Sequence, residues 1–316
     1  MQSEFKLDGL DTLREEMSVA EIGRLIERTA RWVDPATFRL LPVWFPEHAR
    51  GKEFYKENWS SPQMNTNKVS KKQVHKQELN TYGSRALRLA LGIHNLDSRN
   101  WSCCHIWSAD DPTFQLSNHI VKDHRFFSCV GNMVLLPTPL KAFTDAMPEI
   151  KVMLRLCAKN LYGWSCGQDI LPHEHAAVEK FSAWDAYPGS WPRIYGDKVP
   201  LGMMPMHLNP AIYQSAKKRL ERIWFDLVYA GPFFPRKQVQ DAMNYWEEHL
   251  KEHAGVIDRP PLTNDLSRFA ATDADVVPLG GITSVECHLT DEQRKSNTRH
   301  DAVMAELRGT TPAGEY

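Results

Sequence analysis

The sequence predicts a mainly α protein with one small β insert, which places it in the α+β class. Apolar residues recur at helical spacing over most of the chain, whereas between residues 100 and 136 the apolar stretches shorten to the length of strands. Of the 316 residues, 42% are hydrophobic and 24% are charged, and these values are typical of a folded globular chain. The composition therefore excludes a largely disordered, collagen-like or coiled-coil protein.

Helices are expected first at the N-terminus. In residues 7–33 the apolar side chains follow the helical period, and Ser18 with Glu21 three residues later predicts a capping box at the start of a helix. Three prolines then interrupt the pattern. Residues 58–73 are polar and rich in turn formers, which predicts an exposed loop, and a basic helix is expected to follow as far as Leu91.

Two strands and then further helices are expected beyond residue 98. The strands cover residues 101–107 and 126–136 and are separated by a polar loop rich in Asp and His. Helical spacing then predicts helices at 149–161, 173–184, 209–229 and 236–253, with a last polar helix at 290–307. We therefore divide the chain into a helical N-terminal region with a basic segment (1–98), a strand-bearing core (99–165), a helical region (166–255) and a peripheral C-terminal tail (256–316).

The sequence also limits where the protein acts. Its first residues have neither the basic nor the apolar part of a signal peptide, and no apolar run approaches the roughly 20 residues that span a bilayer. These features predict a cytoplasmic protein without membrane insertion. Six cysteines without a Cys-x-x-Cys pair indicate reduced thiols and not a zinc site. A net charge of −1 means that a polyanionic partner has to meet a local basic face.

The most informative motif joins the two predicted strands. The first strand, Trp-Ser-Cys-Cys-His-Ile-Trp, contains His105 and Ile106, and the second contains Gly131 and Asn132 before a run of apolar residues. This arrangement resembles an HNH endonuclease, specifically the divergent branch found at the C-terminus of GmrSD-type restriction enzymes. The resemblance covers about residues 100–155 and implies a small ββα-metal insert in the helical protein.

The resemblance implies a role for each motif residue. His105 would activate water as the general base, because the pKa of an imidazole suits that task at neutral pH. Asn132 would hold the hairpin by side-chain to backbone hydrogen bonds and so orient the base, because an amide donates and accepts without titrating. A divalent cation, with Mg²⁺ expected first and Mn²⁺ or Zn²⁺ as alternatives, would neutralise charge on the phosphate.

The metal ligands are where this chain departs from the family. Cys104 precedes the base at a position where the family has Asp, Glu or His, and a thiol suits Mg²⁺ poorly. Lys141 lies where many HNH sites have their third signature residue, and an ammonium group cannot ligate a cation. We assign Cys104 and Asp145, one helical turn after Lys141, as the metal ligands. Lys141 is assigned to the DNA phosphate.

A second alignment leaves the identity of the base open. The segment Asn-His-Ile-Val that contains His119 also resembles the core of ordinary HNH sites, and it lies closer to Asn132 in the sequence. In that alignment His119 is the general base and Asn118 takes the ligand position. We favour His105, because the residues around it have the pattern of a strand.

A basic segment precedes the predicted core. Between residues 50 and 88 there are nine Lys and Arg residues and three acidic ones. Charges spaced by three and four residues within this segment predict one basic face of a helix, which would follow a DNA backbone. The alternative is an ordinary solvated helix face. We assign the DNA contacts of this segment to Lys68, Lys71, Lys72, Lys76 and Arg85.

These features predict a metal-dependent HNH endonuclease that nicks or cuts DNA. An HNH nuclease embedded in helices is similar to bacterial anti-phage nucleases of the kind found in type II Zorya defence, so other subunits of a defence system are expected partners beside DNA. The alternative, suggested by Cys104 and Lys141, is an inactive HNH-derived module that binds nucleic acid or supports assembly.

Overall fold

The computed structural model describes residues 9–50, 63–66, 73–76, 81–93, 99–108, 120–167, 176, 178, 180, 184–201, 203, 206–230 and 234–252. All of them lie within one unit, Met1–Asn264. This part of the chain is mostly helical with two small antiparallel sheets, as the sequence predicts. The predicted tail (256–316) and its helix lie outside the described residues. Within the described residues, no helix is long and apolar enough to cross a membrane.

The N-terminal helices begin where side chains cap them. The capping box predicted from the sequence is confirmed, because the backbone N–H of Glu21 donates to Ser18 Oγ (3.2 Å) and the N–H of Ser18 donates to Glu21 Oε2 (2.8 Å). The next helix follows Asp34, whose carboxylate accepts from the N–H of Ala36 at 2.7 Å. These helices are α1 (Gly9–Glu16), α2 (Val19–Thr29) and α3 (Pro35–Leu40).

The second of the two antiparallel sheets joins the two strands expected beyond residue 98. Strand β3 (Trp101–His105) pairs with β4 (Met133–Pro137), so that His105 lies opposite Met133 and Trp101 opposite Pro137. The strand predicted for 126–136 starts later than expected. The N–H groups of Phe126 and Phe127 donate to the carbonyl of Asp123. The first residues of the predicted strand therefore belong to a turn and do not pair with β3.

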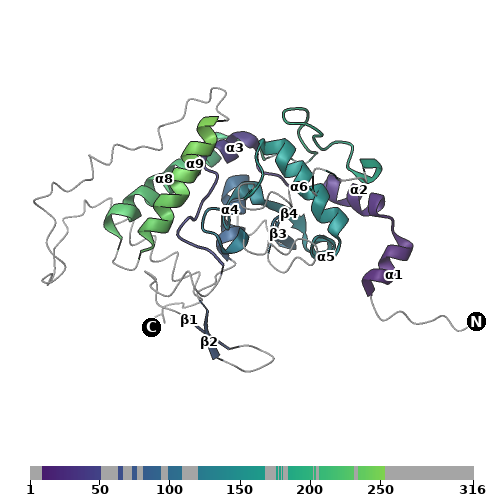
Figure 1. Cartoon of the computed structure of the whole chain (residues 1–316), viewed down its shortest axis with the longest axis horizontal. Coiled ribbons are helices and arrows are strands. Elements are labelled where there is room, and N and C mark those ends of the chain that lie inside the picture. Colours follow the sequence, from purple (N-terminus) through teal and green to yellow (C-terminus); the bar gives the residue numbers. More distant parts are fainter. Residues whose placement is uncertain are drawn as a thin grey trace, which may run out of the picture. The chain divides into compact units, whose positions relative to one another are not determined.

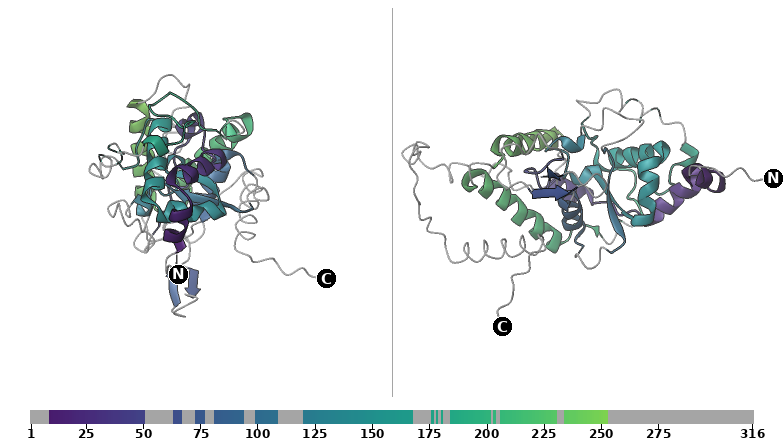
Figure 2. Two further views of the ribbon diagram at one scale, coloured as in Figure 1. Left: turned by 90° about the vertical axis from the view of Figure 1, so that its right-hand side faces the viewer. Right: turned by 90° about the horizontal axis from the view of Figure 1, so that it is seen from below.

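Five further α-helices follow among the described residues, of which all but the short α5, for which no range was predicted, lie close to their predictions. They are α4 (Thr81–Leu91), α5 (Lys141–Ala146), α6 (Pro148–Tyr162), α8 (Pro210–Tyr229) and α9 (Arg236–Glu252). Helix α4 packs against both strands and α5 against β3. Figures 1 and 2 show α8 and α9 on one side of the strand pair and α2 and α6 on the other. Of the helix predicted for 173–184, most residues lie outside the described part, and Trp184 begins a 3-10 turn.

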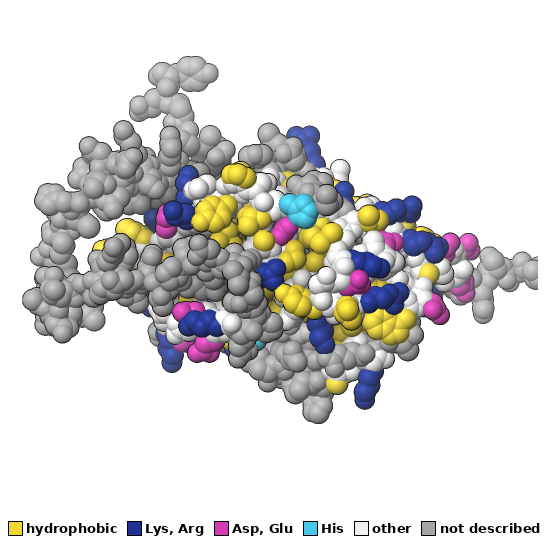
Figure 3. All heavy atoms as spheres, turned by 90° about the horizontal axis from the view of Figure 1, so that it is seen from above, with side chains coloured by type: hydrophobic (Ala, Val, Ile, Leu, Met, Phe, Trp, Pro, Cys, Tyr) yellow, Lys and Arg dark blue, Asp and Glu magenta, His cyan; other side chains and the backbone are white. Residues whose placement is uncertain are grey.

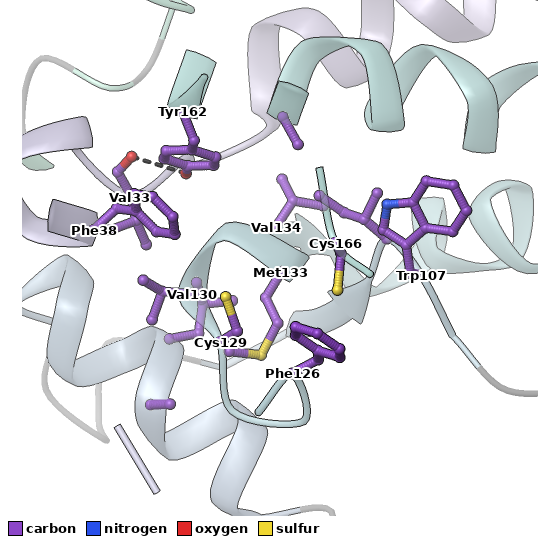
Figure 4. Close-up of a cluster of buried hydrophobic side chains, with 14 of the residues drawn as sticks. Val33, Phe38, Trp107, Phe126, Cys129, Val130, Met133, Val134, Tyr162 and Cys166 are labelled. Carbon is purple, nitrogen blue, oxygen red and sulfur yellow. Dashed lines mark hydrogen bonds between the residues drawn. The ribbon is translucent and has the colours of Figure 1, made fainter. Parts of the chain in front are cut away.

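One hydrophobic core contains residues from three of the predicted ranges, 1–98, 99–165 and 166–255. Met133 and Val134 of β4 are fully buried beside Trp107, Phe126 and other side chains drawn in Figure 4. The same figure shows the hydroxyl of Tyr162 donating to the carbonyl of Val33 at 2.9 Å, which links α6 to the N-terminal region. The predicted core and its two helical neighbours are therefore parts of one packed unit.

The basic segment differs from its prediction. Residues 73–76 form a strand, β2 (Gln73–Lys76), which pairs with β1 (Gln63–Thr66) and sets Lys76 opposite Gln63. The prediction of one helical face through Lys76 is therefore wrong, because a strand does not bring residues spaced by three and four together. Lys68, Lys71 and Lys72 lie outside the described residues. The helix that was expected to end near Leu91 does so as α4.

Candidate active site

The β3–β4 pair sorts the motif residues onto two faces. Successive side chains of a strand point to opposite sides, so Cys103 and His105 share one face and Cys104 lies on the other. Helix α4 covers the face of His105, where a Cβ atom added to Gly83 would lie 3.0 Å from the imidazole Cε1. Cys104 is 3% exposed on the face toward α5, whose Thr144 bonds to its thiol. His105 and its sequence neighbour Cys104 therefore have separate surroundings.

Asn132 closes the end of the hairpin, as the resemblance implies. Its side chain is fully buried, with Oδ1 accepting from the N–H of Trp107 at 2.7 Å and Nδ2 donating to the carbonyl of the same residue at 3.1 Å. The carbonyl of Asn132 also accepts from the N–H of Ile106 at 2.9 Å. Three hydrogen bonds thus join the residue before β4 to the two residues after His105.

His105 is anchored through one ring nitrogen. Its Nε2 lies 2.8 Å from the carbonyl oxygen of Phe127, and the two rings are stacked with centroids 5.7 Å apart. A carbonyl oxygen only accepts, so Nε2 carries the proton in this hydrogen bond and Nδ1 carries the lone pair. The structure therefore fixes both the tautomer and the tilt of the imidazole.

The surroundings of His105 keep its imidazole neutral. Burial lowers its pKa to about 4, and the positive charges of Arg50, Lys151 and Lys141 act in the same direction, whereas the hydrogen bond to Phe127 acts against them. Below neutral pH an ordinary histidine begins to charge, but this one keeps its lone pair. The imidazole is therefore neutral at pH 7 and able to accept a proton, but its lowered pKa makes it a weaker base than an ordinary histidine.

The described residues do not fit the Mg²⁺ site that the resemblance implies. Burial raises the pKa of the Cys104 thiol to about 11, so the thiol is protonated at neutral pH, and the thiolate is the form that binds metals. Asp145 is more than half exposed and pairs with Lys141 at 3.7 Å. Among the described residues, no three His, Cys, Asp or Glu side chains lie together as metal ligands would. Cys104 and Asp145 therefore do not form a site for a hard cation by themselves.

Two buried cations of α6 were missed from the sequence. Lys151 is 4% exposed and its Nζ donates to Ser108 Oγ at 2.6 Å, and Arg155 is 2% exposed with its guanidinium 4.0 Å above the ring of Trp107. Arg155 Nε also donates to the carbonyl of Ile106, at 3.4 Å. The sequence contained a signal for both residues. They are spaced by four in a helix whose neighbouring positions are apolar, and a basic residue at a core position of a helix suggests a functional role.

Of the predicted DNA contacts, the structure describes the side chains of Lys141 and Arg85 alone. Lys141 is half exposed at the start of α5 and affects His105 by its charge. The guanidinium of Arg85 lies 5.2 Å from the ring of Phe45, the residue is half-buried, and burial lowers its pKa. On the face seen in Figure 3, the described basic side chains are mixed with acidic and hydrophobic ones. His119, the alternative base, lies outside the described residues.

Comparisons with known proteins found no relative of this chain. No family model matches the chain, and searches of curated proteins and of solved structures found no match.

Proposed function

We propose that the chain hydrolyses phosphodiester bonds of DNA, with His105 as the general base at the end of the β3–β4 hairpin. The observation that supports this most is the combination of a neutral imidazole held by Phe127 with a buried Asn132 that holds the backbone of Trp107. His105 and Asn132 are also the residues on which the resemblance to HNH endonucleases depends. Sequence and geometry thus favour the same pair.

Hydrolysis at His105 and Asn132 requires a single displacement at phosphorus. Nδ1 of His105 takes a proton from a water molecule, the water oxygen attacks phosphorus, and the P–O bond to one sugar breaks. The leaving sugar oxygen takes up a proton from solvent, and the imidazolium later returns its proton to solvent. One water is consumed, and one phosphate monoester and one hydroxyl are formed. The charges of Arg50, Lys141 and Lys151 favour the negative charge that develops on the phosphate.

The biological setting belongs to the same proposal and depends on the resemblance alone. A nuclease of this kind acts on invading DNA in anti-phage defence, together with other subunits of the system, in the cytoplasm. The divalent cation of the family belongs to the proposal only as a condition to test, because Cys104 and Asp145 do not fit it.

A second function is favoured by the residues at the ligand positions. A protonated Cys104 and a Lys141 that pairs with Asp145 are what an HNH-derived module would have if it bound nucleic acid without cutting it. Binding with no cleavage under any ionic condition is the result that this alternative expects.

The test is cleavage of supercoiled plasmid by the wild type and by His105→Gln, in Mg²⁺, in Mn²⁺ and in EDTA. Glutamine keeps an amide donor for the carbonyl of Phe127 but has no basic nitrogen, so the variant should fold and lose at least about 100-fold in rate. His119→Ala separates the two alignments of the base. His207→Ala is the matched control, since this histidine is 44% exposed and pairs with Asp34, away from the hairpin. Equal rates for wild type and His105→Gln would disprove His105 as the base.

A further inference from the structure

Two positively charged side chains of α6 reach the segment that follows the general base. Lys151 donates to Ser108, three residues after His105, and Arg155 donates to Ile106, one residue after it. Both side chains are almost fully buried, and they lie four residues apart on one helix. The end of the hairpin is thus lined from α6 by ammonium and guanidinium groups.

We infer that Lys151 binds the scissile phosphate at His105 and takes over the charge neutralisation that a divalent cation supplies in related sites. This inference rests on the proposed hydrolysis and adds to it the identity of the electrophilic group. An ammonium group has three donors on a flexible stem, so Lys151 can bond Ser108 and a phosphate oxygen at the same time. Arg155 has a planar group fixed by Trp107 and Ile106, which makes it a positioning residue for Lys151 and the loop end.

The charge of Lys151 is effective at this place because of its burial. Coulomb interactions are stronger where water is excluded, and a preorganised charge needs no rearrangement during the reaction. The charge acts on both hairpin faces, since it lowers the pKa values of His105 and of Cys104. A phosphate close enough to His105 for attack by its water would therefore lie within the field of Lys151.

The ligand chemistry on the page favours the ammonium group over a metal ion. Cys104 has a protonated thiol on the opposite face of the strand, and Asp145 is engaged by Lys141 on an exposed helix. Mg²⁺ prefers charged oxygen ligands that converge, and Cys104 and Asp145 do not provide such a set. Lys141 thus carries a positive charge at a position where many related sites have their third signature residue.

The experiment compares Lys151→Met and Lys151→Arg with the wild type in EDTA, with Lys159→Met on the same helix as the control. We expect the wild type to cleave plasmid in EDTA at a rate close to that in Mg²⁺. Lys151→Met should lower this rate on the order of 100-fold, as loss of one transition-state donor does. Lys151→Arg should retain more activity than Lys151→Met because it keeps the charge, and Lys159→Met should behave as the wild type.

A second measurement separates this inference from the proposed function. Inorganic phosphate is titrated into each protein while the imidazole nitrogen signals of His105 are followed by NMR. Phosphate should shift these signals in the wild type and not in Lys151→Met. Cleavage that EDTA abolishes and Mg²⁺ restores would overturn the inference and leave the proposed nuclease intact. A site that binds phosphate through Lys151 but never cleaves would overturn the nuclease and keep Lys151 as the anion-binding group. Equal phosphate binding by wild type and Lys151→Met would overturn the inference in either case.

Discussion

The side chain of Asn132 satisfies both backbone polar groups of a single residue, Trp107, inside the core. Substitution by alanine removes both hydrogen bonds at once. Each buried group that loses its partner costs about 1–3 kcal/mol, so Asn132→Ala, which leaves two such groups, should lower the free energy of unfolding by about 2–6 kcal/mol. Because the same bonds fix the residues after His105, cleavage should be lost at temperatures where the variant is still folded. Urea unfolding and plasmid cleavage of the same preparation measure the two effects.

Asn209→Ala is the control for this prediction. Asn209 caps α8 through bonds from the N–H groups of Ala211 and Ile212, both at 3.0 Å, and loss of such a cap costs about 1 kcal/mol. This variant should be slightly less stable and cleave normally. If Asn132→Ala and Asn209→Ala have equal rates, Asn132 does not orient the site.

The contacts of individual residues were predictable from the sequence where a local pattern or a motif marks them. The contact of Ser18 follows from spacing along the chain and that of Asn132 from the resemblance, whereas the bond between His105 and Phe127 was not predicted. For Lys151 the sequence shows a basic residue among apolar positions, but its contact with Ser108 was not predictable, because that contact depends on packing between segments far apart in the sequence. The two faces of β3 likewise follow from strand alternation, and they separate Cys104 from His105 although the residues are neighbours.

At the scale of elements, α4 approaches the proposed base, His105, so closely that a Cβ at one of its glycine positions would crowd the imidazole. A Cβ on Gly83 would lie 3.0 Å from Cε1 and 3.3 Å from Nε2 of His105. Alanine favours a helix over glycine by up to about 1 kcal/mol, which offsets the crowding. Gly83→Ala should therefore leave the melting temperature nearly unchanged and lower cleavage at least about tenfold, because a displaced imidazole is misaimed.

Melting curves and cleavage rates of Gly83→Ala are to be compared with those of Gly9→Ala. A Cβ on Gly9, at the start of α1, has nothing within 4 Å, so this variant isolates the effect of helix propensity. A full cleavage rate in Gly83→Ala would show that the ring tolerates displacement and that α4 does not position it.

The elements themselves show which sequence signals suffice. Helices with a continuous apolar period, such as α6, α8 and α9, lie within a few residues of their predictions. The prediction of a helix in the basic segment was wrong, because the spacing of charged residues does not show whether the backbone is a helix or a strand. Residues Gln73–Lys76 form a strand that is paired with Gln63–Thr66. The late start of β4 depends on the turn at Asp123, whose carboxylate also binds Arg125 through Oδ2 at 2.7 Å. Such local side-chain bonds compete with the strand ladder.

At the scale of the whole unit, buried polar groups join segments that the sequence could not pair. Arg219 of α8 forms an ion pair with Glu47 and lies 4.4 Å from the ring of Phe45. His48 stacks on Tyr82 of α4 with ring centroids 3.4 Å apart. Burial lowers the pKa of His48 well below 6.5, and the charges of Arg219 and Arg85 add to this effect. The unit thus contains neutral buried histidines on both sides of the start of α4, where Tyr82 and Gly83 meet His48 and His105.

These histidines make the stability of the folded unit depend on pH. The pKa of His105 is lowered to about 4, and those of His48 and His124 are also lowered, in each case mainly by burial. In the unfolded chain a histidine titrates near 6.5, so below that pH the unfolded state binds more protons than the folded state. Stability is therefore fully present above about pH 6.5 and is lost as the pH falls toward the folded pKa values. The raised pKa of Asp226 acts in the opposite direction.

The free energy of unfolding should fall by about 2 kcal/mol for His105 between pH 7.5 and pH 5, and the lowered pKa of His48 adds a loss in the same direction. Urea unfolding at several pH values measures this slope. His48→Gln and His105→Gln each remove one titrating group, so each should flatten the slope, and the double variant should flatten it by the sum. The absolute stability of a variant does not enter the comparison, because only its change with pH is used. A slope as steep in the double variant as in the wild type would mean that neither imidazole is held neutral by the fold, and the neutral base on which the proposed hydrolysis depends would lose its support.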